Sequence, residues 1–171
     1  MIILKSWMED KKKFITNLYE LYVKDIMKDI NDISIVEKNA DITYILSMLN
    51  KKKHVWVVDS KKNLHILGVL TESDTLMLFS PPYTPMQSFD KPTLQSFQYG
   101  LSVTAEEIMS KNPINVSPEE KIKHVIVIMK QHKIKQMPVV DENNKLLGEV
   151  TLHQFIEEYN KEKKRTKNNI N

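Results

Sequence analysis

One stretch of the chain returns in the same pattern 80 residues later. Residues 67–71 read Leu-Gly-Val-Leu-Thr, and residues 147–151 read Leu-Gly-Glu-Val-Thr. In both stretches an apolar strand ends in threonine. Three residues further on, where a helix is expected to begin, stands Asp74 in the first stretch and Gln154 in the second. Such an offset indicates two copies of one small unit, and this constrains the fold more than any other feature of the sequence.

The segments around these landmarks also recur. Apolar extended segments at 33–36 and 113–116 differ by 80 residues, and strands at 55–59 and 137–141 differ by 82. Between them lies an amphipathic helix with apolar residues at i, i+3, i+4 and i+7. These residues are Ile42, Ile45, Leu46 and Leu49 in the first copy and Ile122, Val125, Ile126 and Met129 in the second. Each copy is therefore predicted to run strand, helix, strand, strand, helix, in an α+β fold.

The copies divide the chain into five predicted parts. They are an N-terminal helix at 1–22, a first domain at 23–79, a linker rich in proline and aromatic residues at 80–103, a second domain at 104–160, and a basic, disordered tail at 161–171. The N-terminal helix carries Phe14 and Leu18, and the linker carries Phe89 and Tyr99. Both segments are too apolar to remain solvated, so we expect them to pack on the body or on a partner subunit in a homodimer.

Composition narrows the class of protein. The 171 residues include no cysteine, which excludes disulfides and thiolate metal sites and favours the cytoplasm. No apolar run has the length of a membrane span, so no membrane partner is expected. The net charge is +3, but residues 161–171 hold five basic residues against Glu162. The rest of the chain is close to neutral, which argues against nucleic acid as a partner and confines that alternative to the tail.

The Thr71 to Asp74 stretch has two interpretations. A carboxylate at a helix start can accept hydrogen bonds from both ribose hydroxyls of a nucleoside, and the Thr71 and Ser73 hydroxyls can bind the sugar or a phosphate. The same Thr-x-x-Asp spacing is also a capping arrangement that needs no ligand. In the second copy Thr151 is followed by Gln154, which keeps the cap and loses the charge. The two copies are therefore expected to be unequal as binding sites.

The matched stretches resemble CBS domains, and the whole resembles a CBS-domain pair, or Bateman module. In the first copy they are Asp25-Ile26-Met27, Val57-Val58-Asp59 and Gly68-Val69-Leu70-Thr71-Glu72-Ser73-Asp74. In the second copy they are Glu107-Ile108-Met109, the stretch from Asn112 to Glu120, Met137-Pro138-Val139-Val140-Asp141 and Gly148-Glu149-Val150-Thr151. The resemblance implies a tandem repeat with pseudo-twofold symmetry. It also implies clefts between the repeats that bind AMP, ADP, ATP or S-adenosylmethionine as a regulatory ligand.

The resemblance also implies which residues line those clefts. Asp74 matches the ribose-binding aspartate of the family, with Thr71 and Ser73 beside it. The other positions carried over are Ser34, Ile35, His54 and Val55 in the first copy and Ile114, Asn115, Lys135, Gln136, Pro138 and Thr151 in the second. Trp56 stands where the second copy has Pro138, and it is either a base-stacking residue or a core residue.

Three functions remain open from the sequence. The first is a ligand-sensing module that binds an adenosine compound, and the second is an interaction module that has lost ligand binding and contacts an unidentified protein. The third is nucleic-acid binding through the tail. No nucleophile motif, phosphate loop or metal-ligand spacing of the five histidines occurs, so neither an enzyme nor a metal site or cofactor is expected.

Overall fold

A computed structural model of the chain describes residues 2–79 and 103–168, which form two compact units. The central unit comprises residues 33–113 together with 143–146, so far as they are described. The terminal unit comprises residues up to Asp32, residues 114–142 and those from Leu147 onward. Neither unit is one continuous stretch of chain, although the sequence repeat is continuous. The domain limits at 23–79 and 104–160 therefore remain predictions from the sequence.

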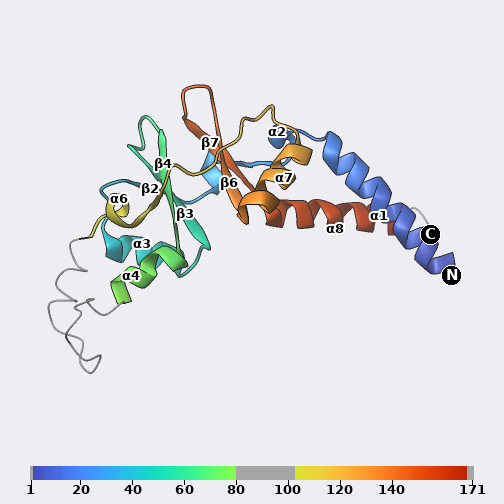
Figure 1. Ribbon diagram of the computed structural model, residues 1–171, viewed down its shortest axis with the longest axis horizontal. Helices are drawn as coiled ribbons and strands as arrows, with labels where there is room; N and C mark the ends of the chain where they lie inside the picture. Colours follow the sequence, from blue (N-terminus) through green and yellow to red (C-terminus); the bar gives the residue numbers. More distant parts are fainter. Residues whose placement is uncertain (1, 80–102, 169–171) are drawn as a thin grey trace. The chain divides into compact units, whose positions relative to one another are not determined.

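The central unit is built on a four-stranded sheet (Figure 1). Its strands are β2 (Ile35–Glu37), β3 (His54–Val58), β4 (Ile66–Thr71) and β5 (Ser110–Lys111), in that order across the sheet. Strand β2 is parallel to β3, and the other neighbours are antiparallel. The helices are α3 (Ile42–Leu49), the 3-10 turn η2 (Glu72–Thr75), α4 (Leu76–Phe79) and α6 (Ala105–Ile108). Asp41 caps the start of α3, and its side chain accepts a hydrogen bond from the Thr43 N–H at 2.7 Å.

The terminal unit has the matching arrangement. Its sheet has the order β1 (Lys28–Asp29), β7 (Leu146–Thr151), β6 (Gln136–Val140), and Val116 adds a single parallel bridge to Val139. The helices are α1 (Ile2–Glu20), α2 (Val23–Ile26), α7 (Ile122–His132) and α8 (Leu152–Asn168), with the 3-10 turn η1 (Ile30–Asp32). The predicted apolar spacing explains why α7 packs here, since Ile122 and Val125 are fully buried. The predicted order of elements is thus confirmed in both copies, and the first strand of the second copy is reduced to the bridge at Val116.

Each unit contains a segment from the other repeat. In the terminal unit, the Val23 N–H donates to the Glu120 carbonyl at 2.9 Å, and β1 pairs with β7. In the central unit, the Ala105 N–H donates to the Ala40 carbonyl at 3.0 Å, and β5 pairs with β4. We call residues 21–29 and 103–111 the exchanged segments. They occupy equivalent places, so the exchange is reciprocal.

The two landmark glycines lie directly under the exchanged segments. A Cβ atom on Gly68 would lie 2.5 Å from Met109 Sδ, and one on Gly148 would lie 2.0 Å from the Lys28 carbonyl oxygen. Real Cβ atoms do not approach other atoms so closely, so both positions require glycine. The repeated glycine in the sequence thus marks the place where a strand from the other repeat crosses.

The N-terminal helix packs on its own chain. The N-terminal helix predicted at 1–22 is present as α1, which runs from Ile2 to Glu20. Leu18 is buried in the core of the terminal unit, and the Phe14 ring meets the Tyr159 ring of α8 edge to face at 5.0 Å. A contact between Lys121 Nζ and Glu20 Oε2 at 2.7 Å lies beside this packing.

The first part of the predicted basic tail continues α8, which ends at Asn168. Lysine and glutamate are good helix formers, and basic side chains are favoured near a helix C-terminus. The Lys161 ammonium also contacts the Glu158 carboxylate at 2.6 Å within the helix. The linker at 80–102 and residues 169–171 lie outside the described residues.

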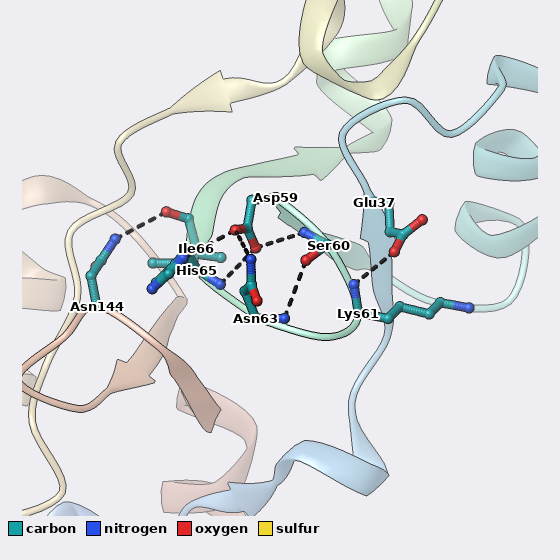
Figure 2. Close-up of polar contacts among 8 residues, drawn as sticks. All are labelled: Glu37, Asp59, Ser60, Lys61, Asn63, His65, Ile66 and Asn144. Carbon is teal, nitrogen blue, oxygen red and sulfur yellow. Dashed lines mark hydrogen bonds and ion pairs between the residues drawn. The ribbon is translucent and has the colours of Figure 1, made fainter.

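The turn between β3 and β4 is held by Asp59 (Figure 2). Its carboxylate accepts hydrogen bonds from the N–H groups of Ser60 (2.6 Å) and His65 (3.0 Å), from Asn63 Nδ2 (3.2 Å), and contacts His65 Nδ1 at 3.0 Å. Burial opposes ionisation, but the hydrogen bonds from His65, Ser60 and Asn63 outweigh it and lower the pKa of Asp59 from 3.8 to about 2. The Val-Val-Asp motif therefore organises a turn.

Residues 143–146 of the second repeat join this turn in the central unit. The Asn144 side chain donates to the Ile66 carbonyl at 3.2 Å, as Figure 2 shows. The Leu146 N–H donates to the Leu64 carbonyl at 2.8 Å. Leu64 and Asn144 both have positive φ, 63° and 61°, which turns each chain sharply enough for the two turns to meet.

Candidate functional site

The residues predicted for the first binding site lie together at one end of the central sheet. The Trp56 N–H donates to the Ser34 carbonyl at 2.9 Å, and Ile35 is the register partner of Trp56. His54 is the register partner of Thr71. Because β2 is parallel to β3 and β4 is antiparallel to it, Ser34, His54 and Thr71 lie at the same end of the sheet, where β2 and β3 begin and β4 ends. The structure thus assembles residues that are far apart in the sequence.

Asp74 lies just beyond this end of the sheet, in the turn η2 that follows β4. Its Oδ2 atom accepts hydrogen bonds from the Thr71 N–H at 2.7 Å and from the Thr71 hydroxyl at 2.6 Å. Its Oδ1 atom accepts one from the Ser110 hydroxyl at 2.7 Å. The helix-cap interpretation of Asp74 is therefore confirmed. A carboxylate has about four lone-pair positions, and these three bonds leave acceptor capacity at a half-buried side chain.

The sequence reasoning missed Ser110. This residue comes from β5, in the exchanged segment, and its hydroxyl reaches Asp74 across 36 positions of sequence. The signal that could have found it is the Ile108-Met109 pair, which matches Ile26-Met27. The residue after this pair, Ser110, begins β5, which pairs with β4 of the first repeat.

The residues predicted for the second site also lie together at one end of their sheet. The Val116 N–H donates to the Pro138 carbonyl at 3.1 Å, which brings the end of the 114–116 segment beside β6. The Leu152 N–H donates to the Lys135 carbonyl at 2.9 Å, which brings the start of α8 beside the start of β6. Ile114, Asn115 and Lys135 are exposed, whereas Thr151 and Pro138 are buried.

Gln154 differs from Asp74 in both burial and bonding. It is 4% exposed, and its Oε1 atom accepts a hydrogen bond from the Thr151 N–H. Its Nε2 atom donates to the carbonyls of Ile26 (3.0 Å) and Glu149 (3.3 Å). The amide is therefore occupied inside the terminal unit. Among the described residues, the Thr151 hydroxyl is buried with no hydrogen-bond partner, whereas the Thr71 hydroxyl donates to Asp74.

Trp56 is a core residue. Its side chain is 1% exposed, and its ring meets the His54 ring edge to face at 5.2 Å. The alternative that it stacks on a base is therefore wrong, because its ring faces are covered by protein.

Two further properties concern the described part of the chain as a whole. Within residues 2–79 and 103–168, no group of three or more histidine or acidic side chains is placed to hold a metal ion. Over the same residues, no helix combines the length and the apolar character that crossing a membrane requires.

Comparison with known proteins identifies the repeat. The CBS domain family matches residues 23–80 and 105–161. Among curated proteins, the chain is 27% identical over 136 residues to arabinose 5-phosphate isomerase KdsD of Francisella tularensis, a match that covers 80% of this chain and 37% of the isomerase. The chain spans about a third of the length of the first curated relatives that it matches.

Two solved structures share the fold. The structure of CBSX2 in complex with AMP has a TM-score of 0.67 and 23% identity, and the match covers 83% of this chain and 98% of that one. The CBS domain of a bacterial CNNM/CorC family Mg²⁺ transporter in complex with ATP has a TM-score of 0.66 and 23% identity, and the match covers 90% of this chain and 96% of that one. At this identity the likeness shows the fold alone, a tandem repeat of α+β units.

Proposed function

The chain belongs to the CBS domain family, and on that premise we propose that it is a regulatory module that binds an adenosine-containing ligand. AMP, ADP, ATP and S-adenosylmethionine are the candidates, and binding alters the packing of the chain or its affinity for a protein partner. The CBSX2 and transporter structures, which contain AMP and ATP, support this ligand class. The cysteine-free composition is in keeping with a cytoplasmic protein.

The Asp74 carboxylate is the observation that carries the proposal. It lies at the end of the sheet where Ser34, His54 and Thr71 are neighbours, and it keeps acceptor capacity beyond its capping bonds. One ribose hydroxyl can donate to the acceptor position that these bonds leave, and bonds to a charged group are about twice as strong as neutral ones. The half-buried Ile35 offers apolar surface to an adenine ring at this end of the sheet, whereas Val55 is fully buried in the core.

The second site is the weaker one in this proposal. Gln154 is buried and its amide already makes three hydrogen bonds, so it offers a ribose no free charged acceptor. The difference between a charged and a neutral acceptor separates the two sites by about tenfold or more in affinity.

We propose that the chain acts by binding and not by catalysis. The isomerase that resembles it is matched over only 37% of its length, so isomerase activity is not carried over. The chemistry that the described site offers is hydrogen-bond acceptance and capping, with a carboxylate whose partners are hydroxyl and backbone N–H groups.

Replacement of Asp74 by Asn tests the proposal. The amide oxygen of Asn can still accept from the Thr71 N–H, as the Gln154 amide does from Thr151, so the cap is retained while the charge is lost. We expect Asp74→Asn to weaken the tightest adenosine ligand by about tenfold in isothermal titration calorimetry. AMP, ADP, ATP and S-adenosylmethionine are titrated separately.

Glu72→Gln is the matched control. It removes the same charge from the same turn, at an exposed position that is not among the predicted binding residues. The affinity of this variant for each adenosine ligand should equal that of the parent protein. If Asp74→Asn binds every adenosine compound as the parent does, Asp74 is a helix cap only and the proposal loses its main residue.

A second candidate function is a protein-interaction module, alone or with ligand binding. Tyr44 of α3 and Leu76 of α4 are 53% and 65% exposed on the central unit, so both offer apolar surface for a contact. We propose that these side chains contribute to a homodimer. The N-terminal helix is less suited to this role than expected, because Phe14 and Leu18 pack within their own unit.

A further inference from the structure

The terminal unit contains an apolar pocket between the end of α7 and the start of α8. Its volume is about 380 Å³, within the range of small-molecule sites. The apolar side chains that line it are Ile126, Met129, Ile134, Leu152 and Phe155. Leu152 is 44% exposed, so the pocket can be reached from solvent.

The polar lining of this pocket is entirely cationic. Lys130, Lys133 and Lys135 complete its wall, and all three are exposed. No acidic residue occurs between 130 and 135, or in the first turn of α8. A helix start usually carries acidic residues, which offset its positive end. Here three lysines and the start of α8 border an apolar surface, and these segments contain no carboxylate.

The first repeat has its own lysines after α3, Lys51, Lys52 and Lys53, but it differs at the start of the following helix. The positions equivalent to Leu152 and Gln154 are Glu72 and Asp74, both in the first turn of η2. The second repeat thus replaces two acidic residues by an apolar one and a neutral one. The Asp74 carboxylate favours a nucleoside diol in the first repeat, and an apolar helix start without a carboxylate favours an apolar anion in the second.

We propose that this pocket binds a small amphipathic anion. Its apolar body lies against Ile126, Ile134 and Leu152, and its anionic group, a carboxylate or a phosphate, lies at the lysine side of the pocket. The charge complementarity of three lysines selects an anion, and the apolar lining selects a ligand with a hydrocarbon or aromatic body.

Lys133 is placed unusually for a lysine. It follows α7 with φ 56° and ψ 30°, the left-handed conformation that glycine normally supplies after a helix. Its N–H donates to the Met129 carbonyl, which closes the end of the helix. Glycine at this position would lower the conformational strain, so the lysine is a costly choice for the fold and supplies a cation to the pocket.

The proposed pocket is distinct from the nucleoside site. Asp74 belongs to the other unit, and neither Thr151 nor Gln154 lines the pocket. Lys135 is the one residue that belongs both to the pocket and to the predicted nucleotide-binding set. Variants that leave Lys135 unchanged therefore separate the two proposals.

Titration of the full chain with decanoate tests the proposal. We expect decanoate to bind with one-to-one stoichiometry, and 1-decanol and acetate to bind at least about tenfold more weakly, since each lacks one half of the recognised structure. Decyl phosphate serves as the second anion and should bind at least about tenfold more tightly than 1-decanol. Equal binding of 1-decanol and decanoate would overturn the role of the lysines.

Three variants locate the site. Lys133→Gly should weaken decanoate binding about threefold or more while leaving the thermal midpoint equal or higher, because it removes a cation and relieves the backbone. Leu152→Ser should also weaken it, and Ile156→Ser, equally exposed on the same helix but outside the lining, should not. Asp74→Asn should leave decanoate affinity unchanged, so failure of the nucleoside proposal leaves this one testable.

The pocket could instead be covered by a second copy of the chain. In that case decanoate would not bind the parent protein, and both Leu152→Ser and Ile156→Ser would shift sedimentation velocity profiles towards the monomer. That outcome, or decanoate affinity unaffected by Lys133→Gly and Leu152→Ser together, overturns the proposal.

Discussion

Asp74 and Gln154 occupy equivalent positions, but their surroundings call for different chemistry. Beside Asp74 the exchanged segment offers a donor, the Ser110 hydroxyl. Beside Gln154 it offers an acceptor, the Ile26 carbonyl, and the Glu149 carbonyl is a second one. A carboxylate suits the first environment because it only accepts, and an amide suits the second because its NH₂ group donates twice. The substitution of Gln for Asp therefore reflects the local backbone as well as any loss of ligand binding.

The Asp59 turn makes a residue-scale prediction about pH. The folded-state pKa of Asp59 is about 2, below its ordinary value of 3.8. The ionised carboxylate therefore stabilises the fold above about pH 4, and this contribution is lost as the pH falls towards 2. We expect Asp59→Asn to lower the free energy of unfolding by about 1 kcal/mol at neutral pH.

Urea denaturation at several pH values measures this difference. The gap between the parent and Asp59→Asn should shrink between pH 4 and pH 2. A gap that stays constant across that range would show that the hydrogen bonds to Asp59 do not depend on its charge.

At the scale of elements, the exchanged strands β1 and β5 depend on glycine beneath them. We predict that Gly148→Ala is the more damaging of two matched substitutions, because its Cβ would lie 2.0 Å from a backbone oxygen, which cannot move without shifting β1. Gly68→Ala meets the flexible Met109 side chain first, although the Ser110 carbonyl is also close at 2.9 Å. Overpacking of this kind costs about 1–3 kcal/mol, with Gly148→Ala at or above the upper limit.

Chemical denaturation of the two alanine variants gives both free energies directly. Equal losses, or a larger loss for Gly68→Ala, would mean that β1 can move away from β7 at little cost.

The repeat made most of these elements predictable, and the exchange set the limit. Periodicity placed the buried residues Ile42, Ile45, Ile122 and Val125 correctly, because helix spacing is a local property of the sequence. A constant offset shows that residues 21–29 match 103–111, but it does not show which sheet each segment joins. For that reason Asp74 was predicted as a site residue, whereas its hydrogen bond to Ser110 was not.

The whole molecule is predicted to be a homodimer that uses exposed apolar side chains of the central unit. We expect Tyr44→Ser combined with Leu76→Ser to shift the chain from dimer to monomer, since both side chains are more than half exposed and their loss removes apolar contact area. Sedimentation velocity over a range of concentrations measures the change.

Thr43→Ser, on the exposed face of the same helix, is the control and should leave the dimer intact. A parent protein that remains monomeric at high concentration would refute the assembly itself. A double variant that still dimerises would place the interface elsewhere.

The reciprocal exchange of residues 21–29 and 103–111 has a consequence for how the chain folds. Neither half of the sequence contains a complete sheet, because each lacks an edge strand that the other half supplies. A fragment cut between the repeats would therefore leave an open edge and an unfilled position at Val23 or Ala105, both fully buried in the intact chain. Folding requires contacts between distant parts of the sequence, so we infer a single cooperative transition of high contact order. If the proposed ligand binds to one repeat, its binding energy would stabilise the other repeat through the same transition.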